Sequence, residues 1–324
     1  MDTLNKELDI DLTIEDLNGL VGYEILIDKD EYNKISEEIR VWVFYKWMHA
    51  LYYYYGSKKP NYIEPNHSNW NDIRIKTHKN YIADTGLPEL YKKIKSIKNI
   101  KLGKVLDLPD GSFLDLLYAR KSVRNFNNEK VTFDELSTIF YIGLRGVKEV
   151  RENISNYMSD LSQLKQSEYI AFEFYIMIYN VEGIEPGIYH YNLENNEFCL
   201  IKKGNYSNEV TDIQMGQKVI ERSKFSIYIG VDFYRYMWRY RYSKKYTLLL
   251  MQVGKVAQQI ITISQVLGIG SFMSPAIKDS KIEKLIGLDG INESVVYFLS
   301  FGKYNKEKGS YMFSNGGNVL EDIK

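Results

Sequence analysis

The sequence predicts an α+β fold. Two segments, residues 172–181 and 225–231, are dense in β-branched and aromatic residues, a composition typical of buried strands. Apolar residues recur at helical spacing from Leu249 to Leu267 and predict a long helix. Strands and helices mix along the chain without a repeat or a low-complexity tract, which indicates an α+β domain.

The first third of the chain differs in character and predicts a mostly helical extension. Residues 4–27 alternate acidic and apolar residues in a helix-like manner, and residues 35–55 predict one amphipathic helix rich in aromatic side chains. Residues 56–79 are polar, contain two prolines and several asparagines, and predict a loop. We therefore place a helical N-terminal extension at residues 1–105 and the main domain at residues 106–324.

The main domain is predicted to begin at a turn over residues 109–111, which read Pro-Asp-Gly, and to continue with a helix over 112–118. Thr132 with Glu135 three residues later is a capping-box pattern, and the apolar residues after it predict a second helix. The remaining predicted elements are the strand 172–181, a hairpin of residues 187–191 and 197–201, the strand 225–231, the helix 248–267 ended by Gly268, and the strand 295–301.

Charge and residue composition exclude several functional classes. The chain has 42 Lys and Arg residues against 42 Asp and Glu residues, so its net charge gives no reason to expect nucleic-acid binding. Cys199 is the only cysteine and lies in an apolar run, where we expect a small buried side chain. A single cysteine excludes both a disulfide framework and a cysteine-based zinc site within one chain. The four histidines show no metal-ligand spacing, so no metal is expected.

Signals for secretion or membrane insertion are missing from the sequence. The first residues are acidic and polar, unlike a secretion signal. The longest apolar stretch, residues 41–55, is interrupted by Lys46 and His49 and is too short to span a bilayer. The sequence therefore predicts a cytoplasmic protein without a membrane span.

The run Arg120-Lys121-Ser122-Val123-Arg124 is a candidate phosphate site. Residues four apart share one helix face, so Arg120 and Arg124 converge if this stretch is helical or turns tightly. Two guanidinium groups and the Ser122 hydroxyl match the oxygens of a phosphate, because arginine donates hydrogen bonds in a rigid fork and keeps its charge. A solvated basic helix end is the alternative interpretation.

Tyrosine is unusually frequent, with 28 residues in the chain. Clusters occur at residues 52–55 and at Tyr234, Tyr236, Tyr240 and Tyr242. Since tyrosine combines an apolar ring with a polar hydroxyl, such clusters are expected to line a wet pocket or an interface. A bias in the nucleotide composition of the source genome is the alternative.

Several segments, taken in order, resemble the flavin-dependent nitroreductase superfamily. Within it they resemble the SagB-type dehydrogenases, which form thiazoles and oxazoles in ribosomally made peptides. The most specific match is residues 181–191, which read Val-Glu-Gly-Ile-Glu-Pro-Gly-Ile-Tyr-His-Tyr, and the resemblance covers residues 110–305. The other matching segments are residues 120–126, 131–136, 173–175, 254–258, 267–270, 287–290 and 301–303.

The resemblance implies FMN as the cofactor. In this chain Arg120, Ser122 and Arg124 would hold the phosphate of FMN, with Lys303 as a further cation. The matching glycine segment adds Gly268 and Gly270 to the residues implied at the flavin site. These six residues are the cofactor site that the resemblance predicts.

The resemblance also implies the family's fold and assembly. The fold is a mixed sheet flanked by helices, and the usual assembly is a homodimer with flavin sites at its interface. The helix over residues 248–267 would then be the central dimer helix, whereas a monomer would bury the same helix in its own core.

Three departures from the family pattern concern the surroundings of the flavin ring. Residues 164–167 read Leu-Lys-Gln-Ser where relatives carry Pro-Ser-x-Gly, whose small residues let the backbone approach the ring. Gln252 replaces the usual glutamate, and Lys255 replaces the usual histidine. The missing Pro-Ser-x-Gly loop is the main support for a rival interpretation, in which the chain is a cofactor-free scaffold or peptide-recognition subunit. The presence of Arg120, Ser122 and Arg124 argues against this rival.

Lys245 and Tyr246 resemble the lysine-tyrosine pair that the azoline-oxidising members place near the substrate. Oxidising a thiazoline or oxazoline to the aromatic azole removes a proton from carbon while a hydride leaves to the flavin, and a lysine or tyrosine can serve as the base. The alternative is a solvated basic stretch over residues 239–245, which could also attract an acidic leader peptide.

The leading functional hypothesis is an FMN-dependent oxidoreductase that acts on a ribosomally synthesised peptide and oxidises thiazolines or oxazolines to thiazoles or oxazoles. The same cofactor would serve the opposite direction, the reduction of a dehydroamino acid, nitro or quinone substrate. Residues 1–105 are expected to bind the peptide or other enzymes of a peptide-modifying complex, on the basis of position and aromatic content.

Overall fold

The structure is a computed structural model that describes residues 13, 15, 29–58, 68–157 and 168–305. The chain forms two compact units, Met1–Asn61 and Tyr62–Lys324. The helix expected over residues 4–27 lies outside the described residues. The functional boundary expected at residue 105 stays a prediction.

In the described residues of the first unit, two helices lie where the sequence predicts one. Helix α3 spans Lys29–Phe44 and helix α4 spans Met48–Gly56. Between them Lys46 has a φ of 60°. A left-handed backbone cannot continue a right-handed helix, so the single helix predicted over residues 35–55 is wrong at this point.

The second unit begins with a helix that the sequence does not predict. Helix α5 spans Trp70–Thr85, so the loop expected over residues 56–79 is wrong from residue 70 onward. Its composition is polar and gives little apolar periodicity, and contact with the rest of the unit supplies the missing stabilisation. The Trp238 indole N–H donates to the Thr85 hydroxyl at 3.0 Å and to the Gly86 carbonyl at 2.8 Å.

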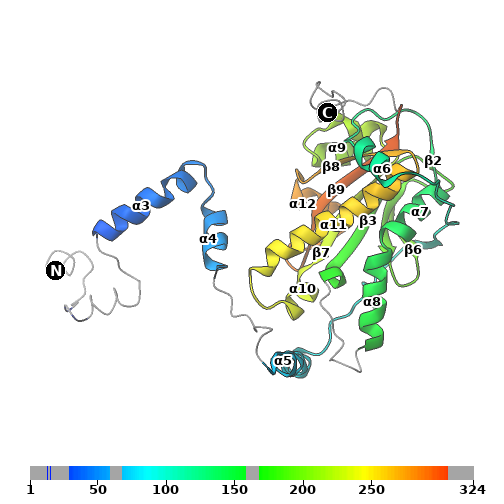
Figure 1. Cartoon of the computed structure of the whole chain (residues 1–324). Helices are drawn as coiled ribbons and strands as arrows, with labels where there is room; N and C mark the ends of the chain where they lie inside the picture. Colours follow the sequence, from blue (N-terminus) through cyan, green and yellow to red (C-terminus); the bar gives the residue numbers. More distant parts are fainter. Residues whose placement is uncertain (1–12, 14, 16–28, 59–67, 158–167, 306–324) are drawn as a thin grey trace. The chain divides into compact units, whose positions relative to one another are not determined.

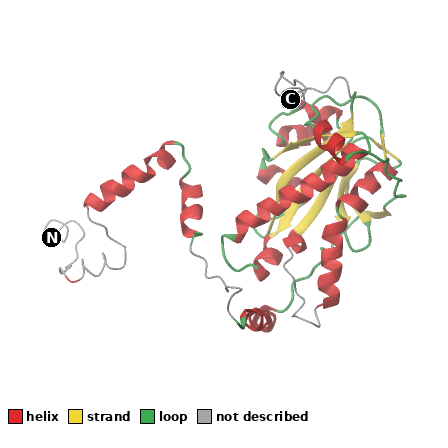
Figure 2. Cartoon of the chain, in the orientation of Figure 1, coloured by secondary structure: helices red, strands yellow, loops and turns green. Residues whose placement is uncertain are grey.

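A β-sheet, yellow in Figure 2, forms the centre of the second unit. It has seven strands in the order β1-β6-β5-β3-β7-β9-β8. All six pairings in this sheet are antiparallel. Within the described residues, parallel pairing occurs between β2 (Val131–Thr132) and β4 (Val181–Glu182) and at a bridge between Ser122 and Ser271. The strands of the sheet are β1 (Lys98–Lys101), β3 (Phe172–Ile178), β5 (Gly187–Asn192), β6 (Glu197–Lys203), β7 (Phe225–Asp232), β8 (Ile269–Ser274) and β9 (Glu293–Lys303).

Helices cover both faces of this sheet, so the expected α+β class is confirmed (Figure 1). The Ser112 side chain caps the first helix of the group, and Thr132 and Glu135 form the predicted capping box. The helices are α6 (Phe113–Ala119), α7 (Phe133–Gly143), α8 (Arg145–Tyr157), α9 (Ser207–Ile213), α10 (Phe233–Arg239), α11 (Lys245–Val266) and α12 (Asp279–Ile286), with short 3-10 helices at Glu168–Ala171 and Lys218–Arg222.

Two hydrophobic cores lie on opposite faces of the sheet. Alternate residues of β3 enter different cores, since side chains of a strand point to opposite faces in turn. Phe174 and Ile176 pack with α7 and α11, whereas Tyr175 and Met177 pack with α9 and α12. Both faces of β3 and β7 are therefore buried, as their continuous apolar composition predicts.

Helix α11 confirms the long helix predicted over residues 248–267. One side of it packs on the first core through residues such as Val253 and Ile260, and Gly143 of α7 approaches the Ile260 backbone so closely that a Cβ there would lie 3.2 Å from it. Gly268 follows with a φ of 68°, a conformation that glycine adopts without strain.

None of the helices in the described parts of the chain is both long enough and apolar enough to cross a membrane.

Candidate functional site

The candidate phosphate site lies on an extended segment and not on a helix. Helix α6 ends at Ala119, and Arg120 has extended backbone angles (φ −67°, ψ 120°). The helix-face argument for Arg120 and Arg124 is therefore wrong. In an extended segment, alternate residues share one side, so a period of two would set Arg120, Ser122 and Arg124 on the same side. That these residues form a phosphate site stays a prediction.

Strand β8 holds this segment in place. The Val123 N–H donates to the Ser271 carbonyl at 2.8 Å, and Val123 is buried. A Cβ on Gly270 would lie 2.8 Å from the Val123 side chain and 2.7 Å from the Tyr304 ring. Gly270 thus lets the basic segment pack closely on β8. Its contact with a cofactor stays a prediction.

The cations of the predicted site have different surroundings. Among the described residues, the Arg120 guanidinium has no ion-pair or hydrogen-bond partner, while Arg124 lies over the Phe272 ring at 5.1 Å. The Lys303 ammonium donates to Glu135 at 2.5 Å and to the Leu267 carbonyl at 3.1 Å. Lys303 therefore lies at the C-terminal end of α11 but already has a carboxylate partner. A Cβ on Gly268 would meet open space.

Lys245 and Tyr246 lie at the other end of α11, in a cavity of about 680 Å³ that we call the aromatic pocket. The four tyrosines at positions 234, 236, 240 and 242 all line it, which confirms the expectation of a pocket at this cluster. Its lining consists of Thr85, Phe233, Tyr234, Tyr236, Met237, Trp238, Tyr240, Arg241, Tyr242, Ser243, Lys245, Tyr246, Leu249 and Ile291.

Neighbouring tyrosines position Lys245. The Tyr236 hydroxyl donates to the Lys245 carbonyl at 2.8 Å. The Lys245 ammonium lies 5.0 Å from the centre of the Tyr240 ring and 5.6 Å from that of Tyr242, within the range of cation–π attraction. Arg239 is buried, so residues 239–245 are not simply a solvated basic stretch.

The two parts of the candidate site are far apart within one chain. Helix α11 has 22 residues, and a rise of 1.5 Å per residue makes it about 33 Å long. Lys245 begins this helix, whereas Ser122 and Lys303 lie beyond its C-terminal end, as the positions of α10 and α6 in Figure 1 also show. The structure therefore does not bring the predicted phosphate site and the predicted catalytic pair together within a single chain.

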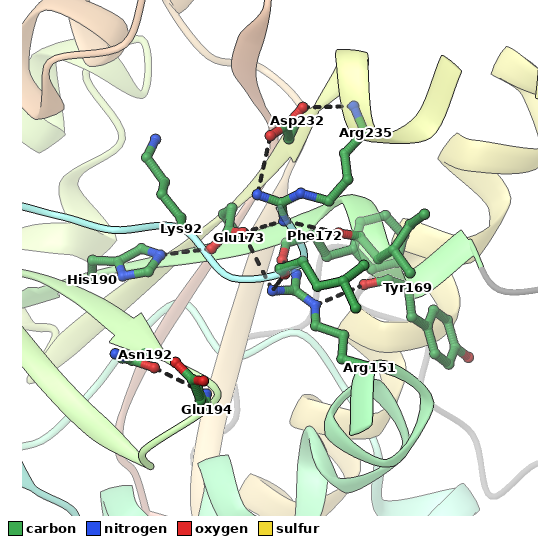
Figure 3. Close-up of polar contacts among 12 residues, drawn as sticks. Lys92, Arg151, Tyr169, Phe172, Glu173, His190, Asn192, Glu194, Asp232 and Arg235 are labelled. Carbon is green, nitrogen blue, oxygen red and sulfur yellow. Dashed lines mark hydrogen bonds and ion pairs between the residues drawn. The ribbon is translucent and has the colours of Figure 1, made fainter. Parts of the chain in front are cut away.

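A buried charge cluster links the sheet to two helices, and the sequence did not predict it (Figure 3). Glu173 on β3 accepts from Arg235 of α10 at 2.6 Å, from Arg151 of α8 at 3.4 Å, and lies 2.7 Å from the His190 ring nitrogen. All four side chains are buried. The sequence carries one signal for this cluster, Glu173 itself, which is a glutamate in an otherwise apolar strand. A buried carboxylate requires charged or hydrogen-bonding partners.

The charges in this cluster balance the cost of burial. Burial alone would raise the pKa of Glu173, but the positive charges of Arg151 and Arg235 and the hydrogen bond with His190 together hold that pKa well below its usual range. Arg151 also donates to the carbonyls of Leu90 and Phe172. The cluster therefore fixes α8 and α10 against the sheet, and α10 carries one wall of the aromatic pocket.

A second polar group lies beside this cluster. The Lys92 ammonium donates to the Tyr175 hydroxyl at 2.8 Å and to Glu293, and the Tyr175 hydroxyl donates to Glu293 at 2.5 Å. Burial and the Glu293 charge raise the pKa of Tyr175 far above its usual range, so this phenol stays protonated. It acts as a fixed donor and not as an acid or base.

Other residues singled out in the sequence have the following positions. Cys199 is buried as expected, and burial raises the pKa of its thiol to about 11. The Lys255 ammonium lies 5.6 Å from the Tyr169 ring centre. Residues 164–167, where the family's Pro-Ser-x-Gly is replaced, lie outside the described residues. In the described ranges no cluster of three or more His, Cys, Asp or Glu residues is arranged to hold a metal ion.

Comparison with known proteins gives a consistent family. A model described as the Nitroreductase family matches residues 117–303, more than half of the chain. The trifolitoxin operon protein TfxC of Rhizobium leguminosarum bv. trifolii is 24% identical over 314 residues, which cover 91% of this chain and 83% of TfxC. The trifolitoxin-processing protein TfxB of the same organism is 26% identical over 130 residues, 38% of this chain and 34% of TfxB.

A solved structure gives the same fold. A candidate nitroreductase from Anabaena variabilis superposes with a TM-score of 0.52 at 21% identity. The superposition covers 68% of this chain but only 44% of that longer chain, so the likeness concerns the fold alone.

Proposed function

The chain belongs to the nitroreductase family, and we propose that it is an FMN-dependent oxidoreductase that oxidises thiazolines or oxazolines to azoles in a ribosomally synthesised peptide. The observation that carries this proposal is the extended backbone at Arg120 and the bridge of Ser122 to β8, since an extended segment would set Arg120, Ser122 and Arg124 on one side. Similarity to TfxC over most of both chains supports a role in maturing a toxin-like product, as does similarity to part of TfxB, which is named a trifolitoxin-processing protein.

The residues present fit the phosphate of FMN. Arg120 and Arg124 supply forked donors and Ser122 supplies a hydroxyl, the donor set that a phosphate prefers. Lys303 lies beside Leu267 but already pairs with Glu135, so the positive charge for the phosphate is assigned to the two arginines, and Gly268 leaves open space nearby. When bound, FMN supplies the hydride acceptor, while the protein binds and orients the reacting groups.

Lys245 and Tyr246 are assigned to proton transfer. Conversion of an azoline to an azole removes two hydrogens from adjacent ring carbons, one as a hydride and one as a proton. The proton goes to a base on the protein, and both side chains face the aromatic pocket in which the azoline would lie. The hydrogen bond from Tyr236 and the neighbouring tyrosine rings hold Lys245 in position for this role.

We propose a homodimer because the predicted phosphate site and the predicted catalytic pair lie at opposite ends of α11 within one chain. Mononucleotides are much shorter than α11, so a flavin held by Arg120 and Arg124 of one copy does not reach Lys245 of the same copy. A second copy placed with its α11 antiparallel to the first would supply Lys245. The side chains of Phe113, Leu114, Leu117 and Tyr118 on α6 and of Leu250 and Met251 on α11 are exposed and apolar, as such an interface requires.

The first unit supports a role in binding the peptide or a partner enzyme. Helix α4 buries none of its residues, and the side chains of Phe44, Trp47, Tyr52 and Tyr55 are exposed. Exposed aromatic residues are typical of protein interaction surfaces. We therefore keep peptide or partner binding as the proposed role of the N-terminal extension.

The opposite redox direction is the second candidate, favoured by the description of the family itself. It would use the same residues to reduce a dehydroamino acid, nitro or quinone substrate. A direct assay separates the two directions.

The experiment is incubation of purified protein with a thiazoline-containing peptide under air and, separately, with a dehydroalanine-containing peptide in the absence of air with NADH or NADPH as the hydride donor. We expect the protein to carry flavin and the thiazoline peptide to lose two mass units, with the dehydroalanine peptide unchanged. Reduction of the alkene without azole formation would establish the second candidate. Protein that neither carries nor takes up FMN would favour the cofactor-free scaffold instead.

A further inference from the structure

We propose that the aromatic pocket recognises a carboxylate of the peptide substrate next to a bulky apolar side chain, and that Arg241 binds this carboxylate. The inference rests on the proposed function, because it takes the ligand to be a peptide. It specifies the chemical class of the peptide segment next to the reacting azoline, which the proposed function leaves open. The pocket has two relevant features: the Arg241 side chain is fixed in one conformation, and the lining residues are mostly aromatic or cationic with no carboxylate among those described.

The Arg241 side chain is held in place although it is exposed. Its Nε donates to the Trp238 carbonyl at 3.2 Å, and its guanidinium lies over the Tyr81 ring with its central carbon 3.7 Å from the ring centre. Stacking and one hydrogen bond together fix the plane of the guanidinium. An arginine on an open surface loses conformational freedom when it binds a ligand, whereas a stacked arginine has lost much of it already.

The two terminal nitrogens of Arg241 remain available. In the described part of the chain they donate to no carboxylate and to no carbonyl, although Arg241 lines the pocket. A guanidinium presents two parallel N–H groups that match the two oxygens of a carboxylate. The free edge of Arg241 is therefore a preformed carboxylate-binding group.

The rest of the lining explains why the ligand supplies the negative charge. None of the described residues that line the pocket is Asp or Glu, while Arg241 and Lys245 both contribute cations. An anionic segment is attracted to this pocket, and a basic segment meets uncompensated positive charge.

The apolar requirement follows from the same lining. Seven of the lining residues are aromatic, and a volume of about 680 Å³ exceeds what one small side chain fills. The indole of Trp238, one of the lining residues, is anchored by its hydrogen bonds to Thr85 and Gly86. Met237 and Ile291 are 54% and 79% exposed, so burying them under a bulky apolar side chain is favourable.

Isothermal titration calorimetry on the full-length protein as purified tests the proposal. The probes are N-acetylated, C-amidated tetrapeptides Gly-Phe-Asp-Gly, Gly-Phe-Asn-Gly and Gly-Ala-Asp-Gly, and acetyl-Gly-Phe with a free C-terminal carboxylate. We expect Gly-Phe-Asp-Gly to bind about ten- to hundred-fold more tightly than Gly-Phe-Asn-Gly, the range of one charge-assisted hydrogen-bonded pair. Gly-Ala-Asp-Gly is expected to bind more weakly than Gly-Phe-Asp-Gly.

Two variants assign the effect to Arg241. Arg241→Gln should abolish the preference for Asp over Asn, and Arg241→Lys should keep only part of it, because lysine has no fork. The matched control Arg145→Gln removes an exposed arginine of α8 and should keep the full preference. Tighter binding of the free-carboxylate dipeptide than of Gly-Phe-Asp-Gly would support the proposal and identify a chain terminus as the source of the carboxylate.

Three results would overturn the proposal: no saturable binding of either carboxylate peptide, equal binding of the Asp and Asn peptides, or an equal loss in the Arg145→Gln control. Calorimetry involves no turnover, so it distinguishes this inference from the proposed function. Failure to oxidise a thiazoline leaves the titration unaffected, and loss of carboxylate preference leaves flavin content unaffected.

Discussion

Replacing both Arg120 and Arg124 by glutamine is expected to remove FMN from the purified protein. Each arginine contributes charge-assisted hydrogen bonds to a phosphate, and each such contact is worth about 1.5–3 kcal/mol. Two lost contacts correspond to a rise of about 10²- to 10⁴-fold in the dissociation constant of FMN. The measurements are absorbance at roughly 450 nm, where flavins absorb, and titration of the stripped protein with FMN.

Two controls make this result specific to the segment. Arg145→Gln combined with Lys148→Gln removes the same charge from α8, away from β8, and should leave FMN binding unchanged. Ser122→Ala removes one hydroxyl and should weaken FMN binding by a smaller factor than the double variant. Equal FMN affinity in the native protein and in the Arg120, Arg124 double variant would show that the extended segment is not the phosphate site.

Lys245→Gln is expected to lower turnover of a thiazoline peptide by about 10²- to 10⁴-fold, the contribution of a positioned general base. FMN content should change little, since the proposed phosphate site consists of Arg120, Ser122 and Arg124 and does not include Lys245. Turnover of the thiazoline peptide and flavin absorbance are measured on the same preparation. This variant therefore separates loss of chemistry from loss of cofactor.

Tyr246→Phe and Lys244→Gln complete the series. If Tyr246 is the base instead, Tyr246→Phe shows the large loss and Lys245→Gln the small one. Lys244→Gln removes an adjacent cation just before α11 and should keep near-native turnover. Native turnover in both the Lys245 and the Tyr246 variants would refute the assignment of proton transfer to this pair.

Local sequence patterns predicted those parts of the fold that local interactions determine. The capping box at Thr132 and Glu135, the β5–β6 hairpin and the long helix α11 all follow from residues close together in the sequence. Helix α5 did not, because its polar sequence depends on contacts with Trp238, 153 residues away from Thr85. Residues 120–124 were misjudged for the same reason, since strand β8 holds them extended.

The roles of the candidate site residues stay predictions, and only their grouping can be compared with the structure. Tyr236, Tyr240 and Lys245 do meet in one pocket, since they are close in the sequence. The partners of Glu173 come from residues 22 and 62 positions away, a pairing that no local pattern indicates. Arg241 was part of an undifferentiated basic stretch until the structure placed it against Tyr81.

The central claim is that a flavin held by one copy meets Lys245 of a second copy, and subunit complementation tests it most directly. The Arg120, Arg124 double variant and the Lys245→Gln variant are first expressed and purified separately. In a further preparation the two variants are co-expressed with different affinity tags. In a mixed dimer, one of the two sites combines the intact arginines of one chain with the intact Lys245 of the other.

We predict that each variant alone is inactive and that random mixing restores roughly one quarter of native thiazoline turnover, because half the dimers are mixed and each has one intact site. Isolated mixed dimers should show about half of native turnover by the same reasoning. Mixed dimers that are as inactive as either variant alone would contradict the account. If each site were built within one chain, one subunit would lack the two arginines and the other would lack Lys245, so neither site would be active.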